Sequence, residues 1–169
     1  WQKACALSGS ERASALADCR NRIGRIGTPQ LAAQCLTALQ GFNQPPNGRW
    51  AVRSSATNED TAHTSFAGLY HTHLGVALFE IDTAIKDLWA SLWEERVVSY
   101  QVRQSNHTAP RMAVVVQPMV EAQSAGVAYS IHPVTGRSNQ VTINAVPGLA
   151  APLVDGTVAP DQYVVEVTD

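Results

Sequence analysis

Apolar residues recur at helical spacing through the first quarter of the chain. Leu31, Cys35 and Leu39 follow one another at four-residue steps, which places them on one side of a helix. Residues 1–41 are therefore predicted to be helical. The run at 43–48 is rich in Asn, Pro and Gly, which are typical of turns, and it predicts a connector.

Two strands and a long helix are predicted in the middle of the chain. Residues 50–52 form a short apolar run that leads into a polar loop at 53–65, and residues 69–76 alternate as in a strand. Residues 81–104 predict one helix with a wide apolar face buried against a sheet. That face is made of two adjacent stripes, one of Ile81, Ile85, Leu88 and Leu92 and the other of Trp89, Trp93, Val97 and Tyr100.

The character of the chain changes after Pro110. Segments with strand character follow, separated by Gly, Pro, Ser and Asn: 111–120, 126–131, 140–145 and 163–167. Helices, then a mixed segment, then strands predict an α+β protein. We expect two unlike lobes, residues 1–108 and residues 109–169.

Composition and charge narrow the classes of partner. Hydrophobic residues make up 45% and charged residues 15% of the 169 residues, so the chain can bury a substantial core. The net charge of −2 and the pI near 6.2 give no electrostatic reason to expect nucleic acid or an anionic membrane as a partner. No apolar run approaches the roughly 18 residues of a membrane span, and no signal peptide opens the chain. Any recognition of phosphate is therefore expected to be local.

The cysteines bear on the cellular compartment of the protein, and the first residue bears on whether the chain is a piece of a longer one. Cys5, Cys19 and Cys35 match neither a zinc-binding pattern nor a disulfide framework. They are predicted to be buried free thiols in helices, as in a protein of the reducing cytoplasm. The chain begins with Trp1 rather than methionine, which indicates a piece of a longer protein or a processed one.

One polar segment has the residue types of an anion site. It runs Arg53-Ser54-Ser55-Ala56-Thr57-Asn58-Glu59-Asp60 and is followed by Ser65-Phe66-Ala67-Gly68. An arginine at the end of a strand presents a planar fork to phosphate oxygens, and small residues such as Gly68 let backbone N–H groups approach an anion closely. The alternative is an ordinary polar loop with a surface arginine.

A second segment has the residue types of an adenine site. An apolar strand ends in Gln117-Pro118-Met119-Val120, whose backbone can hydrogen-bond the edge of a base while Met119 and Val120 contact the ring. The alternative is a plain buried strand. Residues 124–149 predict two strands joined by a Pro-Val-Thr-Gly turn, which form a hairpin that can fold over a nucleotide.

The histidines and one acidic pair are given a structural interpretation. His71 and His73 lie two apart on a predicted strand and so face the same side, but no third metal ligand accompanies them. We interpret them as surface residues, with a metal pair as the alternative. Glu94 and Glu95 are interpreted as a solvated helix face rather than as acid–base catalysts. No metal ligand is assigned within the chain.

Five runs carry a resemblance to a known family. They are VRSSATNEDTAHTSFAGLYHTHLGV, LWASLWEERVVSYQ, MAVVVQPMVEAQSAGVAYSIHPVTG, INAVPGL and DGTVAPDQYVV. In this order they resemble the nucleotide-binding domain of phosphoenolpyruvate synthases and pyruvate phosphate dikinases, which rifamycin phosphotransferases share. The resemblance covers residues 50–167 and is weak over residues 1–49.

The resemblance implies an ATP-grasp fold that holds ATP and Mg²⁺ between two lobes. It implies that the parent protein passes a phosphoryl group to a histidine on a separate domain, which carries it to a pyruvate-binding domain. It also implies roles for residues. Arg53 is expected to contact the phosphates and so to serve catalysis as well as binding, and Gly68 and Thr72 are expected to close over the phosphates. Gln117, Met119 and Val120 are expected on the adenine side.

Departures from the family pattern limit these expectations. Gly148-Leu149 is followed by Ala150-Ala151 where the family usually has Gly-Glu, Leu69 stands where glutamine is common, and His132 replaces a frequent aspartate. The family's glycine-rich, lysine-bearing N-terminal segment and its C-terminal acidic metal ligands are also missing. We therefore expect the Mg²⁺ ligands to lie outside this chain and the piece alone to be inactive. A rifamycin phosphotransferase and a degenerate, non-catalytic nucleotide-binding module stay as alternatives.

Overall fold

The computed structural model describes residues 1–42, 44–57, 69–104 and 108–167. They form two compact units, Trp1–Met119 and Val120–Asp169. Each unit contains one three-stranded sheet, and helices accompany both, so the predicted α+β class is confirmed. Among the described residues, no helix combines the length and the apolar character needed to cross a membrane.

The first unit is built around an antiparallel sheet of order β2-β1-β3. The central strand β1 (Arg49–Ala56) pairs with β2 (Thr72–Ala77) on one side and with β3 (Met112–Pro118) on the other. One irregularity interrupts β2, where Leu74 and Gly75 together oppose Ala51. Gly75 has φ +70°, a conformation that glycine adopts without steric cost, so it accommodates this β-bulge.

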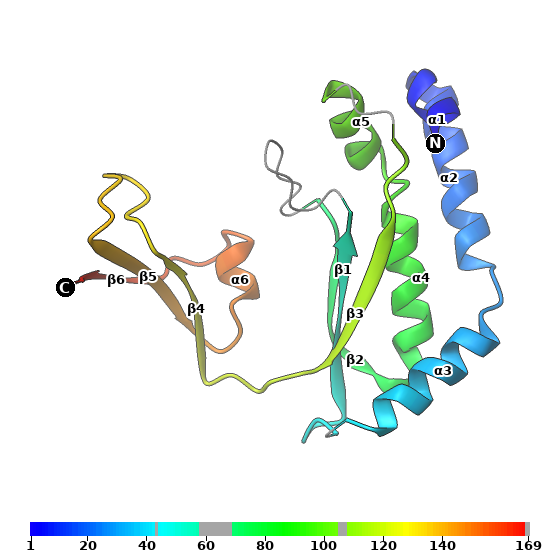
Figure 1. Ribbon diagram of the computed structural model, residues 1–169. Coiled ribbons are helices and arrows are strands. Elements are labelled where there is room, and N and C mark those ends of the chain that lie inside the picture. Colours follow the sequence, from blue (N-terminus) through cyan, green and yellow to red (C-terminus); the bar gives the residue numbers. More distant parts are fainter. Residues whose placement is uncertain (43, 58–68, 105–107, 168–169) are drawn as a thin grey trace. The chain divides into compact units, whose positions relative to one another are not determined.

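Helices cover one face of this sheet (Figure 1). The elements are α1 (Gln2–Ala6), α2 (Gly9–Gly24), α3 (Pro29–Gln40), the 3₁₀ turn η1 (Leu78–Glu80), α4 (Ile81–Ser91) and α5 (Glu95–Arg103). Helix α4 lies directly on the sheet, where Leu88, Ile85 and Ile81 pack against Trp50 and Val52. Burial of these large apolar side chains is the main stabilising contribution in this unit.

The helical prediction for the first 41 residues is confirmed, whereas the single helix over 81–104 is wrong. The chain makes a turn after α4 in which the N–H groups of Trp93 and Glu94 bond carbonyls three residues back, and Glu94 then adopts an extended conformation. Helix α5 begins at Glu95 in a new direction (Figure 1). The break lets Val97 and Val98 enter cores away from the face that Leu88 fills.

Strand β1 is longer than predicted. It continues through Ala56, so the expected polar loop at 53–65 begins inside a strand. Ser54 is buried on the side of Trp50 and Val52, so it belongs to the core face of the strand rather than to a loop.

The compact units divide at a different place from the two expected lobes. Strand β3 pairs with β1 from Met112 to Pro118, which ties it into the first sheet. The units therefore separate between Met119 and Val120 rather than between residues 108 and 109. Whether ATP-grasp lobes divide at 108 stays a prediction.

The second unit contains an antiparallel sheet of order β4-β5-β6. Its strands are β4 (Ser124–Tyr129), β5 (Gln140–Pro147) and β6 (Asp161–Glu166), and the short helix α6 (Ala151–Val154) precedes β6. The predicted hairpin is present and turns at His132, whose ring nitrogen Nδ1 accepts hydrogen bonds from the N–H groups of Val134 and Thr135.

The three cysteines are free thiols in α1, α2 and α3, as predicted, but the prediction that all are buried is wrong, because Cys19 and Cys35 are half-buried. Cys5 is buried, and that burial raises the pKa of its thiol although the N-terminal charge and Arg12 act in the opposite direction. A raised pKa keeps the thiol protonated and unreactive.

Candidate functional site

The sheet of the first unit has one face covered by helices, and none of the helices described in this unit lies on the other face, which is called the open face. Along β1, Trp50, Val52 and Ser54 are buried on the covered face, and Arg53 projects with Ser55 from the other. Arg53 pairs with Thr72 of β2 and with Val115 of β3. Residues paired directly across an antiparallel ladder point to the same face, so Arg53 and Thr72 are neighbours on the open face.

Gln117 belongs to the same open face. It pairs with Ala51, which lies two positions before Arg53 on β1. Two positions along a strand correspond to about 7 Å, and paired side chains begin about 5 Å apart. The register therefore gathers Arg53, Thr72 and Gln117, which the sequence singles out, within the reach of one nucleotide-sized ligand.

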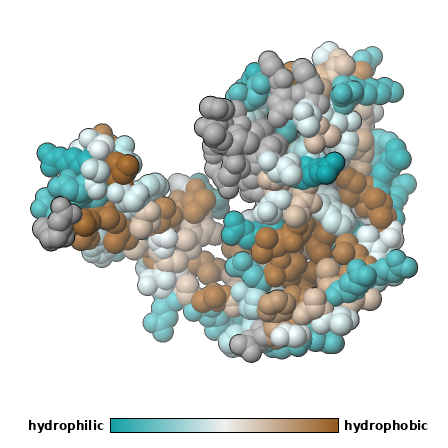
Figure 2. Space-filling view, viewed as in Figure 1, coloured by the Kyte–Doolittle hydropathy of each residue, from teal (hydrophilic) through white to brown (hydrophobic). Residues whose placement is uncertain are grey.

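The open face combines this polar group with apolar surface. Val115 and Leu74 are 40% and 44% exposed, and Ala51 lies between them on the central strand. Figure 2 shows apolar atoms over the strands of this unit beside polar ones. Exposed apolar side chains with a cation beside them suit a ligand that has both a ring and an anionic group.

Arg53 has a different setting from the one expected. The prediction of an arginine at a strand end is wrong, because Arg53 lies inside β1 with hydrogen-bonded strands on both sides. Its side chain is exposed, and within the described ranges it forms no ion pair. By contrast, Arg12 and Arg96 are paired with Glu95 and Glu94. A guanidinium on a rigid strand, with no acidic partner among the described residues, suits an anionic ligand.

The remaining expected site residues are placed as follows. The Met119 N–H donates a hydrogen bond of 3.0 Å to the Arg49 carbonyl, so this donor is already used by the sheet. Val120 is 73% exposed and belongs to the second unit, while Gln117 and Met119 belong to the first. Gly68 lies outside the described residues.

The structure also shows an ionic network that the sequence interpretation missed. Glu94 is half-buried rather than solvated, and its carboxylate contacts His71 Nε2 and Arg96 Nε, each at 2.7 Å. Partial burial raises the pKa of Glu94, but the hydrogen bonds and charges of Arg96 and His71 outweigh it and hold the pKa below its ordinary value. Glu95 is exposed, as expected, and bonds Arg12 and Ser99.

The two histidines near the start of β2 have different settings, because His71 is exposed, as interpreted from the sequence, whereas His73 is half-buried. His71 immediately precedes the strand and bonds Glu94, whereas His73 pairs with Val52 on the covered face, where its Nε2 is buried. Among the residues that the structure describes, no group of three or more His, Cys, Asp or Glu side chains is arranged to hold a metal ion.

The Ala150-Ala151 pair, which departs from the pattern of the resembled family, lies in the second unit. Ala150 is the N-cap of α6 and Ala151 is its first residue. The glutamate usual at this position in the resembled family is thus replaced by a methyl group at the start of a four-residue helix.

Comparison with known proteins agrees with the sequence motifs. A family model described as the AMP/ATP-binding domain of pyruvate phosphate dikinase matches residues 25–169, which begins earlier than the resemblance expected from residue 50. A phosphoenolpyruvate synthase of Aeropyrum pernix is 44% identical over 136 residues, which cover 79% of this chain and 16% of that protein. The phosphoenolpyruvate synthase of Pyrococcus furiosus is 42% identical over 118 residues, 69% of this chain and 14% of that protein.

The name of another relative gives a different activity. A rifampicin phosphotransferase of a Streptomyces species is 40% identical over 149 residues, which cover 86% of this chain and 17% of that protein. The chain thus spans no more than 17% of the length of any of these three relatives. With a model match over most of the chain, this protein belongs to the family of pyruvate phosphate dikinase AMP/ATP-binding domains.

Proposed function

We propose that this chain binds ATP for a dikinase-type phosphotransferase and passes a phosphoryl group to a histidine on another domain of the parent protein. The parent protein then makes or consumes phosphoenolpyruvate by exchanging that group with pyruvate on a third domain. The observation that supports this most is the open sheet face of the first unit, where Arg53, Thr72 and Gln117 lie together. We expect the parent protein to work in the cytoplasm, in keeping with its free thiols.

The proposed role of Arg53 follows from the demands of phosphoryl transfer. This reaction gains mostly from positioning and from neutralising charge on the phosphate oxygens. Arg53 supplies a planar fork of N–H donors, and the Thr72 hydroxyl beside it supplies a further donor. In this proposal Gly68, which precedes β2 in sequence, brings its backbone close to the same phosphates.

The adenine side is proposed at the other end of the same face. Gln117 offers an amide that both donates and accepts, and Met119 offers apolar contact, while the same role for Val120 stays a prediction from the sequence. The Met119 N–H already donates a hydrogen bond to the Arg49 carbonyl. We therefore propose that the base contacts the Pro118 carbonyl instead, because this carbonyl points away from β1 in the antiparallel ladder.

No step of the proposed reaction is assigned to Mg²⁺ held by this chain. The described residues contain no cluster of His, Cys, Asp or Glu that fits a metal ion. We propose that the metal ligands lie elsewhere in the parent protein, and we derive the action of this chain only from its own cation, hydroxyl and amide groups.

The test is a calorimetric titration of the parent protein with Mg²⁺ and a non-hydrolysable ATP analogue. Arg53→Ala should raise the Kd about 10- to 100-fold, because a charge-assisted hydrogen bond contributes about 1.5–3 kcal/mol. Arg22→Ala is the matched control, since Arg22 is exposed in the last turn of α2. Arg96 is unsuitable as a control because it bonds Glu94. Equal affinity in the two variants would remove the case for Arg53.

Two alternatives are tested by the same protein. The rifampicin phosphotransferase match covers 86% of this chain, so an acceptor assay should compare pyruvate with rifampicin as the final phosphoryl acceptor. Transfer to rifampicin and not to pyruvate would favour that alternative. The methyl group at Ala151 supports a degenerate module, and failure to bind the analogue by a folded protein would favour a purely structural role.

A further inference from the structure

The start of strand β2 is held by helix α5 through two adjacent residues. Tyr70 is buried and packs with Val97 of α5 in one apolar cluster. His71, the next residue, contacts Glu94 at the N-cap of the same helix. The entry to β2 is thus fixed by an apolar contact and a polar contact on the same helix.

The hydrogen bond between His71 and Glu94 has a defined donor and acceptor. His71 Nε2 lies 2.7 Å from Glu94 Oε1 and 2.9 Å from an Arg96 NH2 nitrogen. One ring nitrogen cannot donate to a carboxylate and accept from a guanidinium at the same time. Donation to Glu94 is favoured because the distance is shorter and the acceptor is charged. Arg96 is satisfied by the second carboxylate oxygen of Glu94, 2.7 Å from its Nε.

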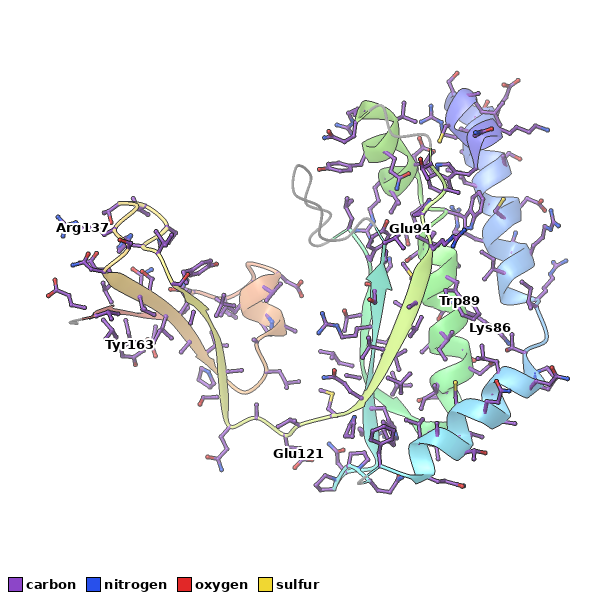
Figure 3. All side chains as sticks on the ribbon, viewed as in Figure 1. Lys86, Trp89, Glu94, Glu121, Arg137 and Tyr163 are labelled. Atoms are coloured by element: carbon purple, nitrogen blue, oxygen red, sulfur yellow. The ribbon has the colours of Figure 1, made fainter. Side chains whose placement is uncertain are left out.

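Each member of this network has a restrained position. Glu94 lies at the break between α4 and α5, where its backbone is extended, and Figure 3 labels it there. Both of its carboxylate oxygens are engaged, one by His71 and one by Arg96. The ring of His71 is therefore oriented from the helix side, and the backbone one residue later is Thr72, which pairs with Arg53.

We propose that His71, Glu94 and Arg96 form a positioning clamp, which holds Thr72 beside Arg53 and so sets the affinity for the nucleotide phosphates without touching them. This inference rests on the proposed function, because it assigns the clamp to the same open face. His71 and Glu94 are positioning residues rather than catalytic ones.

The clamp is expected to matter more for binding than for stability. The side chains of His71 and Arg96 are each 45% exposed and that of Glu94 is 29% exposed. Ion pairs with this much solvent contact contribute little to the free energy of unfolding. The apolar contact of Tyr70 with Val97 persists when the polar clamp is removed, so the chain should still fold. Displacing a hydrogen-bond donor nevertheless weakens its contact with a ligand, because hydrogen bonds lose strength steeply as their geometry departs from the ideal.

The experiment measures the Kd of Mg²⁺ and a non-hydrolysable ATP analogue for variants of the parent protein, together with the midpoint of thermal unfolding. His71→Ala should raise the Kd about three- to tenfold, while the conservative His71→Gln, which keeps a donor at a similar reach, should restore most of the affinity. Glu95→Gln is the matched control, because Glu95 neighbours Glu94 but bonds Arg12 and Ser99 instead.

A double-mutant cycle separates positioning from general destabilisation. If the clamp acts through Thr72, adding His71→Ala to Thr72→Ala should change the Kd little further. Additive effects, no rescue by His71→Gln, or an unchanged Kd in His71→Ala would each overturn the clamp. If Arg53→Ala alone binds the analogue like the wild type, the proposed function fails, and that result is distinct from failure of the clamp.

Discussion

Gly126 offers a sharp test of the second unit, because the close approach of two strands there leaves no room for a side chain. A Cβ at this position in β4 would lie 2.3 Å from the Asn144 carbonyl oxygen, 3.2 Å from the Asn144 carbonyl carbon and 3.1 Å from the Ala145 Cα. All three atoms belong to the backbone of the central strand β5. They can move away only if the β4–β5 ladder opens.

Gly126→Ala should therefore destabilise the second unit by about 2 kcal/mol, within the usual cost of overpacking. The chain itself forms two compact units, so local hydrogen exchange is a better assay than a single unfolding curve. Amides of β5 and β6 should exchange about 30-fold faster, which corresponds to that free energy. Amides of β1 and α4 belong to the first unit and should keep their protection.

The control makes the same chemical change where the structure has room. Gly24 ends α2, and a Cβ there meets no atom within 4 Å. Gly24→Ala should leave stability unchanged or raise it by about 0.5–1 kcal/mol, since alanine reduces the entropy of the unfolded chain. The reasoning is refuted if Gly126→Ala leaves the exchange of β5 unaltered, or if Gly24→Ala is equally destabilising.

Two further predictions concern the first unit. Gln117→Ala should raise the KM for ATP about 2- to 10-fold with a smaller change in kcat, because it removes one neutral hydrogen bond of about 0.5–1.5 kcal/mol on the adenine side. Steady-state kinetics measure both constants, and a fall in kcat at unchanged KM would contradict this prediction. The pKa of Glu94 is lowered in the folded state. The ionised Glu94 carboxylate therefore contributes fully to stability above the ordinary glutamate pKa of about 4.3, and this contribution is lost as the pH falls through the lowered pKa. Glu94→Gln should flatten that part of the dependence of Tm on pH between about pH 6 and pH 3, and an identical pH profile would show that Glu94 has no such coupling.

The sequence predicts the elements better than their ends. The helices before residue 41 and the strands after residue 110 follow from periodicity and from turn residues, and both are confirmed. The break between α4 and α5 escapes prediction because apolar spacing continues through Trp93 and Val97, and no Gly or Pro marks it. The break arises from hydrogen bonds to carbonyls three residues back and from the packing that α5 finds afterwards.

The candidate site depends on register, which a single sequence does not contain. Arg53 and Gln117 are 64 positions apart, and only the pairing of β1 with β3 shows that they share a face. Ser54 and Ser55 look like a loop because they are polar, yet one is buried beneath the helices and the other exposed within the same strand. The ionic network of Glu94 was missed for the same reason, since His71 lies 23 positions away.

The central claim is that the guanidinium of Arg53 meets the phosphates of a bound nucleotide, and chemical footprinting tests it directly. Phenylglyoxal modifies accessible arginines, and both Arg53 and Arg22 are exposed. Mass spectrometry of the parent protein, labelled with and without saturating Mg²⁺ and a non-hydrolysable ATP analogue, should show labelling of Arg53 falling while labelling of Arg22 stays the same. If the bound analogue leaves Arg53 as reactive as Arg22, the guanidinium does not contact the nucleotide and the account is contradicted.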